Sequence, residues 1–197
     1  MNNDKTSASQ LSELTQDIDR ILITEIEIKN RIIEIGRQIS NDYHGKNPLL
    51  IGVLKGVLFF LADLLRCITI PVEVDFLAVS SYSTEARNKG VVRLVKDLDI
   101  PIQDRHILFV EDVVDTGLTL NYLLKNLKMR NPTSIQVCTL FDKSKHRLVS
   151  LPLSYVGFEL PDRFVVGYGL DFREKYRNLP FVGLLKPSVL AREMDGE

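Results

Sequence analysis

Four strand-like segments alternate with segments of helical character, and this alternation constrains the fold more than any other feature of the chain. The strand-like segments cover Leu49–Leu54 and residues 72–79, 106–110 and 135–140. Leu49–Leu54 is an unbroken apolar run, which is typical of a strand buried on both faces of a parallel sheet. Strands that alternate with helices indicate an α/β fold. We therefore predict a mainly parallel central sheet that is flanked by helices.

The remaining segments complete this outline. Thr24 and Glu27 fit the S/T-x-x-E capping box, and isoleucine then recurs at positions 28, 32, 35 and 39, on one helical face. Further helices are expected over residues 57–67 and 118–129. Shorter strands are expected at residues 21–23, 91–95, 155–158, 164–167 and 181–185, and the polar stretch 80–90 is expected to form a long loop.

Composition limits the partners of such a chain. The 197 residues carry a net charge of −1, so no overall field attracts nucleic acid or an anionic membrane. No apolar run reaches transmembrane length, and residues 1–10 lack an apolar signal core. Cys67 and Cys138 lie far apart in apolar surroundings, which favours buried free thiols over a disulfide or a metal pair. A cytoplasmic protein that binds neither nucleic acid nor membranes is expected.

Polar groups gather where the third strand-like segment leads into a helix. Thr116, Gly117 and Thr119 offer backbone N–H groups and hydroxyls at the expected helix N-terminus, which is a favourable place for a phosphate. Carboxylates at Glu111 and Asp112 would repel a phosphate on its own. They can, however, accept hydrogen bonds from a ribose diol or hold Mg²⁺, which prefers hard oxygen ligands. A phosphorylated sugar satisfies all of these groups together.

Each of these residues also has an ordinary structural explanation. Asp115 or Thr116 can serve as an N-cap, and Glu111 and Asp112 can be solvated charges at a strand end. Taken together, however, the residues favour a ligand site. In parallel sheets ligands bind beyond the carboxyl ends of the strands. That rule indicates Lys55-Gly56, the loop after Val79 and the segment from Glu111.

The segment 110–119 resembles the binding motif for phosphoribosyl pyrophosphate (PRPP) of the type I phosphoribosyltransferases. That motif is an apolar strand, two acids, two apolar residues and Asp-Thr/Ser-Gly-x-Thr. Further matches between about residues 21 and 187 narrow the resemblance to the hypoxanthine-guanine branch of the family. They are Val53-Leu54-Lys55-Gly56, Ser81-Tyr82, Lys143, residues 156–159 and 161–168, Leu170-Asp171 and Arg177.

The resemblance implies a type I phosphoribosyltransferase fold. The central, mainly parallel sheet is flanked by helices, and a small hood subdomain is formed by the N- and C-terminal segments. We expect one domain over residues 1–197, with its core at about 24–150 and its hood at about 11–23 and 151–197. Residues 1–10 are expected to be disordered.

The resemblance also assigns roles to individual positions. Asp115 is the expected general base. PRPP, through its 5′-phosphate and ribose, is expected to bind Glu111, Asp112, Asp115, Thr116, Gly117, Leu118 and Thr119. The pyrophosphate is expected to bind Arg177 and the turn Leu54, Lys55 and Gly56, in which the Leu54–Lys55 peptide is often cis in the family. Ser81 and Tyr82 belong to a lid loop, and Lys143, Phe164, Val165 and Asp171 belong to the purine site. Mg²⁺ is expected at Glu111, Asp112 and Asp171.

The implied reaction transfers the 5-phosphoribosyl group from PRPP to N9 of hypoxanthine or guanine, forming IMP or GMP and pyrophosphate. Lys143 would donate to the purine O6 and so exclude adenine, whose 6-amino group is itself a donor. Family members commonly form homodimers or homotetramers. A non-catalytic regulator that senses PRPP stays an alternative, although the roughly twenty residues before the fold are too few for a DNA-binding domain. Another acceptor base, such as uracil, adenine or orotate, is the nearest rival. The three histidines, His44, His106 and His146, show no ligand spacing, and no role is assigned to them.

Overall fold

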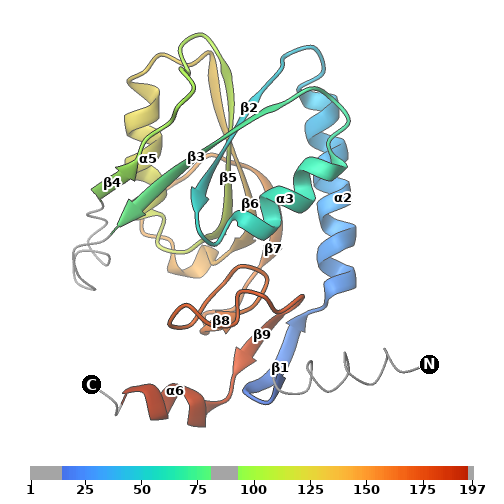
Figure 1. Ribbon diagram of the computed structural model, residues 1–197, viewed down its shortest axis with the longest axis vertical. Coiled ribbons are helices and arrows are strands. Elements are labelled where there is room, and N and C mark those ends of the chain that lie inside the picture. Colours follow the sequence, from blue (N-terminus) through green and yellow to red (C-terminus); the bar gives the residue numbers. More distant parts are fainter. Residues whose placement is uncertain (1–14, 81–92, 195–197) are drawn as a thin grey trace. The chain divides into compact units, whose positions relative to one another are not determined.

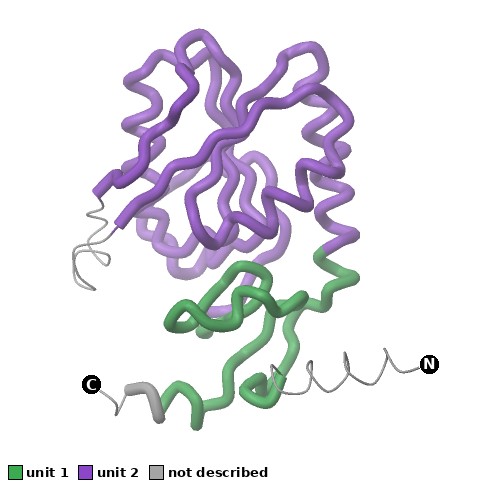
Figure 2. The backbone as a smooth tube through the Cα atoms, in the orientation of Figure 1, with its two compact units in different colours: residues 1–28, 163–197 green, residues 29–162 purple. Residues whose placement is uncertain are grey.

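The computed structural model describes residues 15–80 and 93–194 of the chain (Figure 1). The chain divides into two compact units (Figure 2). The large unit is Lys29–Asp162, and the small unit combines Met1–Ile28 with Arg163–Glu197. Among the helices in the described ranges, none is both long enough and apolar enough to cross a membrane.

The large unit is built on a six-stranded sheet, as the alternation of segments predicted. Across the sheet the strands are β4 (Arg93–Lys96), β3 (Glu73–Ser80), β2 (Leu49–Leu54), β5 (His106–Val114), β6 (Ser134–Asp142) and β7 (Leu153–Glu159). All neighbouring pairs are parallel except β3 with β4. The prediction of a mainly parallel sheet is confirmed, and the carboxyl ends of β2, β5, β6 and β7 share one edge.

Helices cover both faces of this sheet (Figure 1). On one face, α5 (Leu118–Lys128) buries four leucines against a core that includes Leu49, Ile51 and Phe109. On the other face lie α2 (Glu25–Asp42) and α3 (Leu58–Cys67). Successive strand residues point to opposite faces, and Gly52 faces α3: a Cβ there would lie 2.9 Å from Cγ1 of Val57. The apolar run of β2 is therefore explained by burial on both faces.

The capping box at the start of α2 is confirmed. The Thr24 N–H donates to Oε2 of Glu27 over 2.8 Å, and the Glu27 N–H donates to Oγ1 of Thr24 over 3.3 Å. These reciprocal bonds satisfy donors that the first helical turn leaves open. The Thr24 hydroxyl also donates to Oε2 of Glu27, over 2.6 Å, and this bond, together with the bond from the Thr24 N–H, lowers the pKa of Glu27 because both favour its carboxylate form.

The small unit has an antiparallel sheet of its own in the order β1 (Ile18–Ile23), β9 (Val182–Leu185) and β8 (Val165–Val166). The helix α6 (Pro187–Met194) follows β9. This helix was not predicted from the sequence, although a proline at the first helical position is a known start signal. The Tyr176 hydroxyl donates to Oδ2 of Asp17 over 2.7 Å and ties two distant segments of this unit together.

Two boundaries differ from those expected. β5 continues to Val114 rather than ending at residue 110, because β6 extends alongside it and pairs with Val113 and Val114. The C-terminal part of the hood was expected from about residue 151, whereas β7 pairs with β6 and belongs to the large unit, which runs to Asp162. Cys67 and Cys138 are free thiols, as predicted, with Cys138 buried and Cys67 half-buried. The expectations for residues 1–10, Ser81 and Tyr82 lie outside the described residues.

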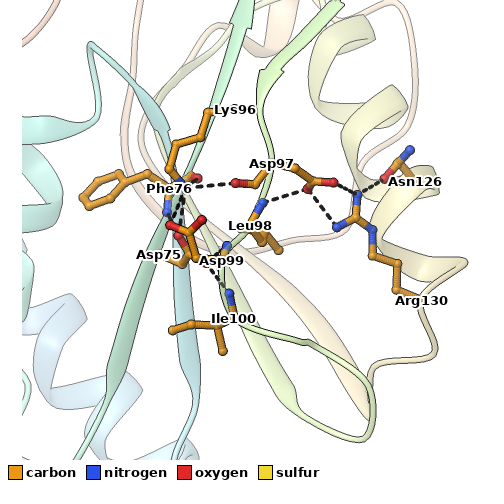
Figure 3. Close-up of polar contacts among 9 residues, drawn as sticks. All are labelled: Asp75, Phe76, Lys96, Asp97, Leu98, Asp99, Ile100, Asn126 and Arg130. Carbon is orange, nitrogen blue, oxygen red and sulfur yellow. Dashed lines mark hydrogen bonds and ion pairs between the residues drawn. The ribbon is translucent and has the colours of Figure 1, made fainter.

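A buried carboxylate fixes the connection that follows β4 (Figure 3). Asp75 on β3 is 6 % exposed and accepts hydrogen bonds from the N–H groups of Phe76, Asp99 and Ile100, over 2.7, 2.7 and 2.9 Å. Lys96 adds an ion pair at 3.3 Å. Burial alone would raise the pKa of Asp75, but these hydrogen bonds together outweigh it and lower the pKa. The carboxylate form is therefore the stable one in the folded protein.

We predict that Asp75→Asn lowers the free energy of unfolding at neutral pH by about 1–3 kcal/mol, because one acceptor oxygen is replaced by a donor facing N–H groups. Since the pKa of Asp75 is lower in the folded state, this stabilisation is present above the unfolded value of about 3.9 and is lost as the pH falls through the folded value. Urea unfolding at several pH values measures the free energy of unfolding of each variant. Asp19→Asn, at an exposed position, is the control. An equal loss in both variants would contradict the prediction.

Candidate functional site

A cavity of about 350 Å³ opens at the carboxyl ends of β2 and β5 in the large unit. Two turns line it, one after β2 and one between β5 and α5. Its lining residues are Val53, Leu54, Lys55, Gly56, Glu111, Asp112, Val113, Val114, Asp115, Thr116, Gly117, Thr119 and Leu120. The cavity thus lies where the topology of a parallel sheet places a ligand, and it joins two of the three predicted places.

The acidic pair at the end of β5 is not a pair of solvated charges. Glu111 is only 9 % exposed, and burial, with a smaller contribution from the charge of Asp112, raises its pKa well above the ordinary value. Oδ1 of Asp112 accepts a hydrogen bond from the Val113 N–H over 2.9 Å. A buried carboxyl group of this kind lining a cavity is characteristic of functional sites. The simple strand-end explanation therefore fails for Glu111.

The start of α5 is open toward a ligand. The N-cap residue is Gly117, with φ of 80°, rather than Asp115 or Thr116, and no described side chain caps the helix. The Thr116 hydroxyl accepts only a long bond of 3.5 Å from the Leu118 N–H. The first N–H groups of a helix lack partners within it, and the helix dipole adds partial positive charge there. This end of α5 can bind an anion.

The turn after β2 approaches the acidic pair closely. The peptide bond between Leu54 and Lys55 is cis, as the resemblance suggested. A Cβ on Gly56 would lie 1.8 Å from Oδ2 of Asp112, so any other residue there would displace this carboxylate. The fold therefore brings Lys55-Gly56 and Glu111-Asp112 into one cavity although they are more than fifty positions apart in the chain.

Asp115 is held by residues from the segment after β6. Its Oδ1 lies 3.1 Å from Nδ1 of His146, and its backbone carbonyl accepts from Nε of Arg147 over 3.1 Å. Arg147 also pairs with the carboxylate of Asp142. Neither His146 nor Arg147 was predicted as a site residue from the sequence. Only the paired ends of β5 and β6 bring them to Asp115, and no local spacing signals a contact across 31 or 32 positions.

Lys143 lies at the end of β6, next to the same turn. Its backbone N–H donates to the Val114 carbonyl over 2.9 Å, which extends the pairing of β5 with β6. It precedes the short 3₁₀ helix η1 (Ser144–His146). The backbone of Lys143 therefore lies beside the turn that carries Asp115.

Four further expected site residues, Phe164, Val165, Asp171 and Arg177, belong to the small unit. Phe164 is 47 % exposed and packs edge-on against Phe172, with the ring centroids 5.4 Å apart. Val165 is buried in β8. Arg177 pairs with Asp171 over 2.9 Å, while its Nε is buried without a hydrogen-bond partner among the described residues. Such an orphaned donor is unusual in a folded protein and is consistent with a missing acceptor.

The described residues contain no group of three or more His, Cys, Asp and Glu side chains that could together hold a metal ion. Glu111 and Asp112 nevertheless present neighbouring carboxyl groups in the cavity. Mg²⁺ commonly takes only one or two protein carboxylates and completes its shell with water and substrate phosphates. The donor set in the cavity fits that kind of binding.

Comparison with known proteins gives consistent matches. The model of the phosphoribosyl transferase domain family matches residues 20–173. The hypoxanthine-guanine phosphoribosyltransferase of Bacillus subtilis is 47% identical over 176 residues, which cover 89% of this chain and 98% of the relative. That of Mycobacterium tuberculosis is 49% identical over 179 residues, covering 88% of this chain and 89% of the relative.

Solved structures agree with these sequence matches. A crystal structure of a hypoxanthine-guanine phosphoribosyltransferase from Bacillus anthracis has a TM-score of 0.83 and 43% identity, with coverage of 86% of this chain and 99% of that one. The hypoxanthine phosphoribosyltransferase of Trypanosoma cruzi has a TM-score of 0.87 and 40% identity, with coverage of 92% and 98%. Both the sequence and the fold of the chain are thus similar to the same group of proteins.

Gly117 provides a test of how the turn before α5 is built. Left-handed backbone costs an alanine about 1–2 kcal/mol, and a Cβ on Gly117 would also lie 2.7 Å from Cδ1 of Leu151 and 2.9 Å from Cδ of Arg147. We therefore expect Gly117→Ala to lower the free energy of unfolding by more than this backbone cost.

Gly45→Ala is the matched control, since Gly45 has φ of 74° and nothing within 4 Å of a Cβ there. Denaturant unfolding compares the two variants. Equal losses would show that the crowding beside Gly117 does not matter.

Proposed function

Because this chain belongs to the phosphoribosyltransferase family, we propose that it transfers the 5-phosphoribosyl group from PRPP to N9 of hypoxanthine or guanine. The products are IMP or GMP and pyrophosphate. The observation that carries the proposal is one cavity that combines the buried acidic end of β5 with the uncapped start of α5. The helix start suits the 5′-phosphate of a phosphorylated sugar, and the acidic residues suit its ribose hydroxyls.

The 5′-phosphate binds the start of α5. The N–H groups of the first helical turn and the hydroxyls of Thr116 and Thr119 are its donors, and the helix dipole favours its negative charge. Gly117 and Leu118 contribute through their backbone, since a side chain at position 117 would collide with its neighbours. This assignment uses groups that have few protein partners in the described structure.

The ribose and the leaving group lie toward the acidic pair. Glu111 and Asp112 accept hydrogen bonds from the ribose hydroxyls. Mg²⁺ would be held by Glu111, Asp112 and Asp171, and when bound it supplies neutralisation of the charge that develops on pyrophosphate. The turn Leu54, Lys55 and Gly56 donates to the pyrophosphate. Arg177 does so as well, because its planar guanidinium suits oxyanions and its buried Nε lacks an acceptor.

Asp115 is the proposed general base. It takes or shares the proton at N7 of the purine while N9 attacks the anomeric carbon and the bond to pyrophosphate breaks. Its position supports this role, because it lines the same cavity as the groups assigned to the sugar phosphate. Most of the remaining rate acceleration is expected from holding the two substrates close together in the orientation that the reaction needs.

The base is selected by Lys143, Phe164, Val165 and Asp171. Lys143 donates to O6 of the purine, Phe164 stacks on the ring, and Val165 presents main-chain groups to it. The exposure of Phe164 leaves it free to cover a flat ligand. The proposal includes the family's usual setting: a cytoplasmic enzyme that forms a homodimer or homotetramer.

An assay with free bases tests this function directly. Purified protein is mixed with PRPP, Mg²⁺ and each of hypoxanthine, guanine, adenine, uracil and orotate, and both nucleotide and pyrophosphate are measured. We expect product with hypoxanthine or guanine. Product with adenine alone would contradict the role of Lys143. If PRPP binds but no base reacts, the chain is a regulator rather than an enzyme.

We further predict that Asp115→Asn lowers kcat by about 10²–10⁴-fold, the usual contribution of proton transfer by a positioned side chain. The KM for PRPP should change by no more than a few-fold, since the phosphate donors stay in place. Steady-state kinetics measures both. The control is Asp104→Asn, an exposed carboxylate just before the amino end of β5. An unchanged kcat in Asp115→Asn would exclude the general-base role.

A further inference from the structure

The imidazole of His146 lies between two carboxylates of the large unit. Its Nδ1 is 3.1 Å from Oδ1 of Asp115, and its Nε2 is 2.5 Å from Oδ1 of Asp162. A neutral imidazole carries a single N–H, whereas the imidazolium form carries two. Both contacts are therefore hydrogen bonds only when His146 is protonated.

Three strand ends hold this arrangement in place. The Lys143 N–H bonds to the Val114 carbonyl at the end of β5, and the His146 N–H bonds to the Lys143 carbonyl within η1, each over 2.9 Å. Asp162 follows β7, where the Leu160 N–H donates to the Asp142 carbonyl over 2.8 Å. The ring is thus positioned by backbone hydrogen bonds between β5, β6 and β7.

Asp115 is bound on one side only. His146 engages Oδ1, and Arg147 engages the backbone carbonyl of the same residue. Oδ2 of Asp115 has no hydrogen bond to any residue in the described ranges, and the residue lines the cavity. One carboxylate oxygen is anchored, and the other is left to accept a proton from a ligand.

We propose that His146 is a positioning residue: it anchors the Asp115 carboxylate through Oδ1, Asp162 fixes the imidazole ring, and Oδ2 of Asp115 is thereby presented to the purine. A base held by a second group, which is held in turn by a third, is a recurrent arrangement in catalytic sites. The inference rests on the proposed role of Asp115 as the general base.

Protonation of His146 makes this arrangement sensitive to pH. The hydrogen bond to Asp162 is the largest cause that raises the pKa of His146; slight burial opposes it, and the bond to Asp115 adds to it. The imidazolium is therefore present below and somewhat above the ordinary value of about 6.5. As the pH rises through the folded value, the ring loses one N–H, and one of its two carboxylate contacts is lost.

The other charged groups around the ring already have partners or lie apart from it. Arg147 pairs with Asp142, and Glu159 accepts a hydrogen bond from the Ser144 hydroxyl. Lys145 is exposed and neighbours His146 on η1. Among the described residues, Asp115 and Asp162 are the two carboxylates that contact the ring, so the titration of His146 itself decides whether both contacts persist.

The main test is the pH profile of His146→Gln with PRPP, Mg²⁺ and hypoxanthine. In the unmodified protein we expect kcat to fall as the pH rises above the pKa of His146. His146→Gln should lower kcat about tenfold at pH 7 and remove this fall, because the glutamine amide does not titrate. The KM for PRPP should stay within about twofold. A variant with unchanged kcat and an unchanged pH profile would overturn the proposal.

Three further variants distinguish a positioning role of His146 from a general loss of structure. His44→Gln makes the same substitution at an exposed histidine beyond α2, and Lys145→Gln removes a neighbouring positive charge; both should keep the original profile. Asp162→Asn retains His146 but removes the carboxylate that stabilises its protonated ring. The pKa of His146 should therefore fall, and the decrease in kcat should occur at lower pH. If His146→Gln fails to fold, as judged by thermal unfolding, Asp162→Asn carries the test. An unshifted profile in Asp162→Asn would then refute the role.

Nuclear magnetic resonance titration of the three histidine rings gives a readout that does not depend on activity. The midpoint of His146 should lie above about 6.5 and should fall in both Asp162→Asn and Asp115→Asn. A midpoint that neither variant changes would refute the contact itself. If the unmodified protein reacts with no base, the proposed function fails, and this titration still reports on the contact. If the protein is active but His146→Gln behaves like the controls, only the positioning role fails.

Discussion

The parallel pairing of β5 with β2 on one side and β6 on the other is the constraint on which the rest of the large unit depends. It places the carboxyl ends of these strands at one edge, so that the turns that follow them meet there. It also keeps Glu111 in a backbone ladder, where burial raises the pKa of its carboxyl group. The turn after β2 lies so close to β5 at this edge that a side chain at position 56 would displace the Asp112 carboxylate.

The site is assembled from short segments that have little in common in sequence. The turn after β5 supplies Asp115 and the open helix start to the cavity, and the segment after β6 carries Lys143 and His146, which we propose as a purine ligand and a positioning residue. The segment after β7 supplies Asp162. Each segment is tied to its neighbour by backbone hydrogen bonds, which leaves side-chain oxygens and N–H groups available for a ligand. In α/β proteins, the strands and helices usually form a rigid framework, and the turns at the carboxyl ends of the strands carry the functional side chains.

Much of this was predictable from local patterns. The bounds of β2, the capping box at Thr24 and Glu27 and the helix after Gly117 follow from apolar spacing and from side-chain chemistry within a few residues. The role of β7 and the length of β5 did not follow, because strand length is set by a neighbouring strand rather than by the residues of the strand itself. His146 was missed for a similar reason. Its partners lie 31 and 16 positions away, and no spacing rule connects them.

The sequence by itself determined the α/β class, the succession of the elements and the chemistry-bearing segment from Glu111 to Thr119, because hydrophobic period, capping and turn preferences act over short stretches of chain. Only the tertiary structure decided that Glu111 is buried, that Gly117 rather than Asp115 caps α5, and that His146 lies between Asp115 and Asp162. These features depend on which strand ends become neighbours. Packing between elements far apart in the chain determines which strand ends are neighbours, and no local sequence pattern predicts this.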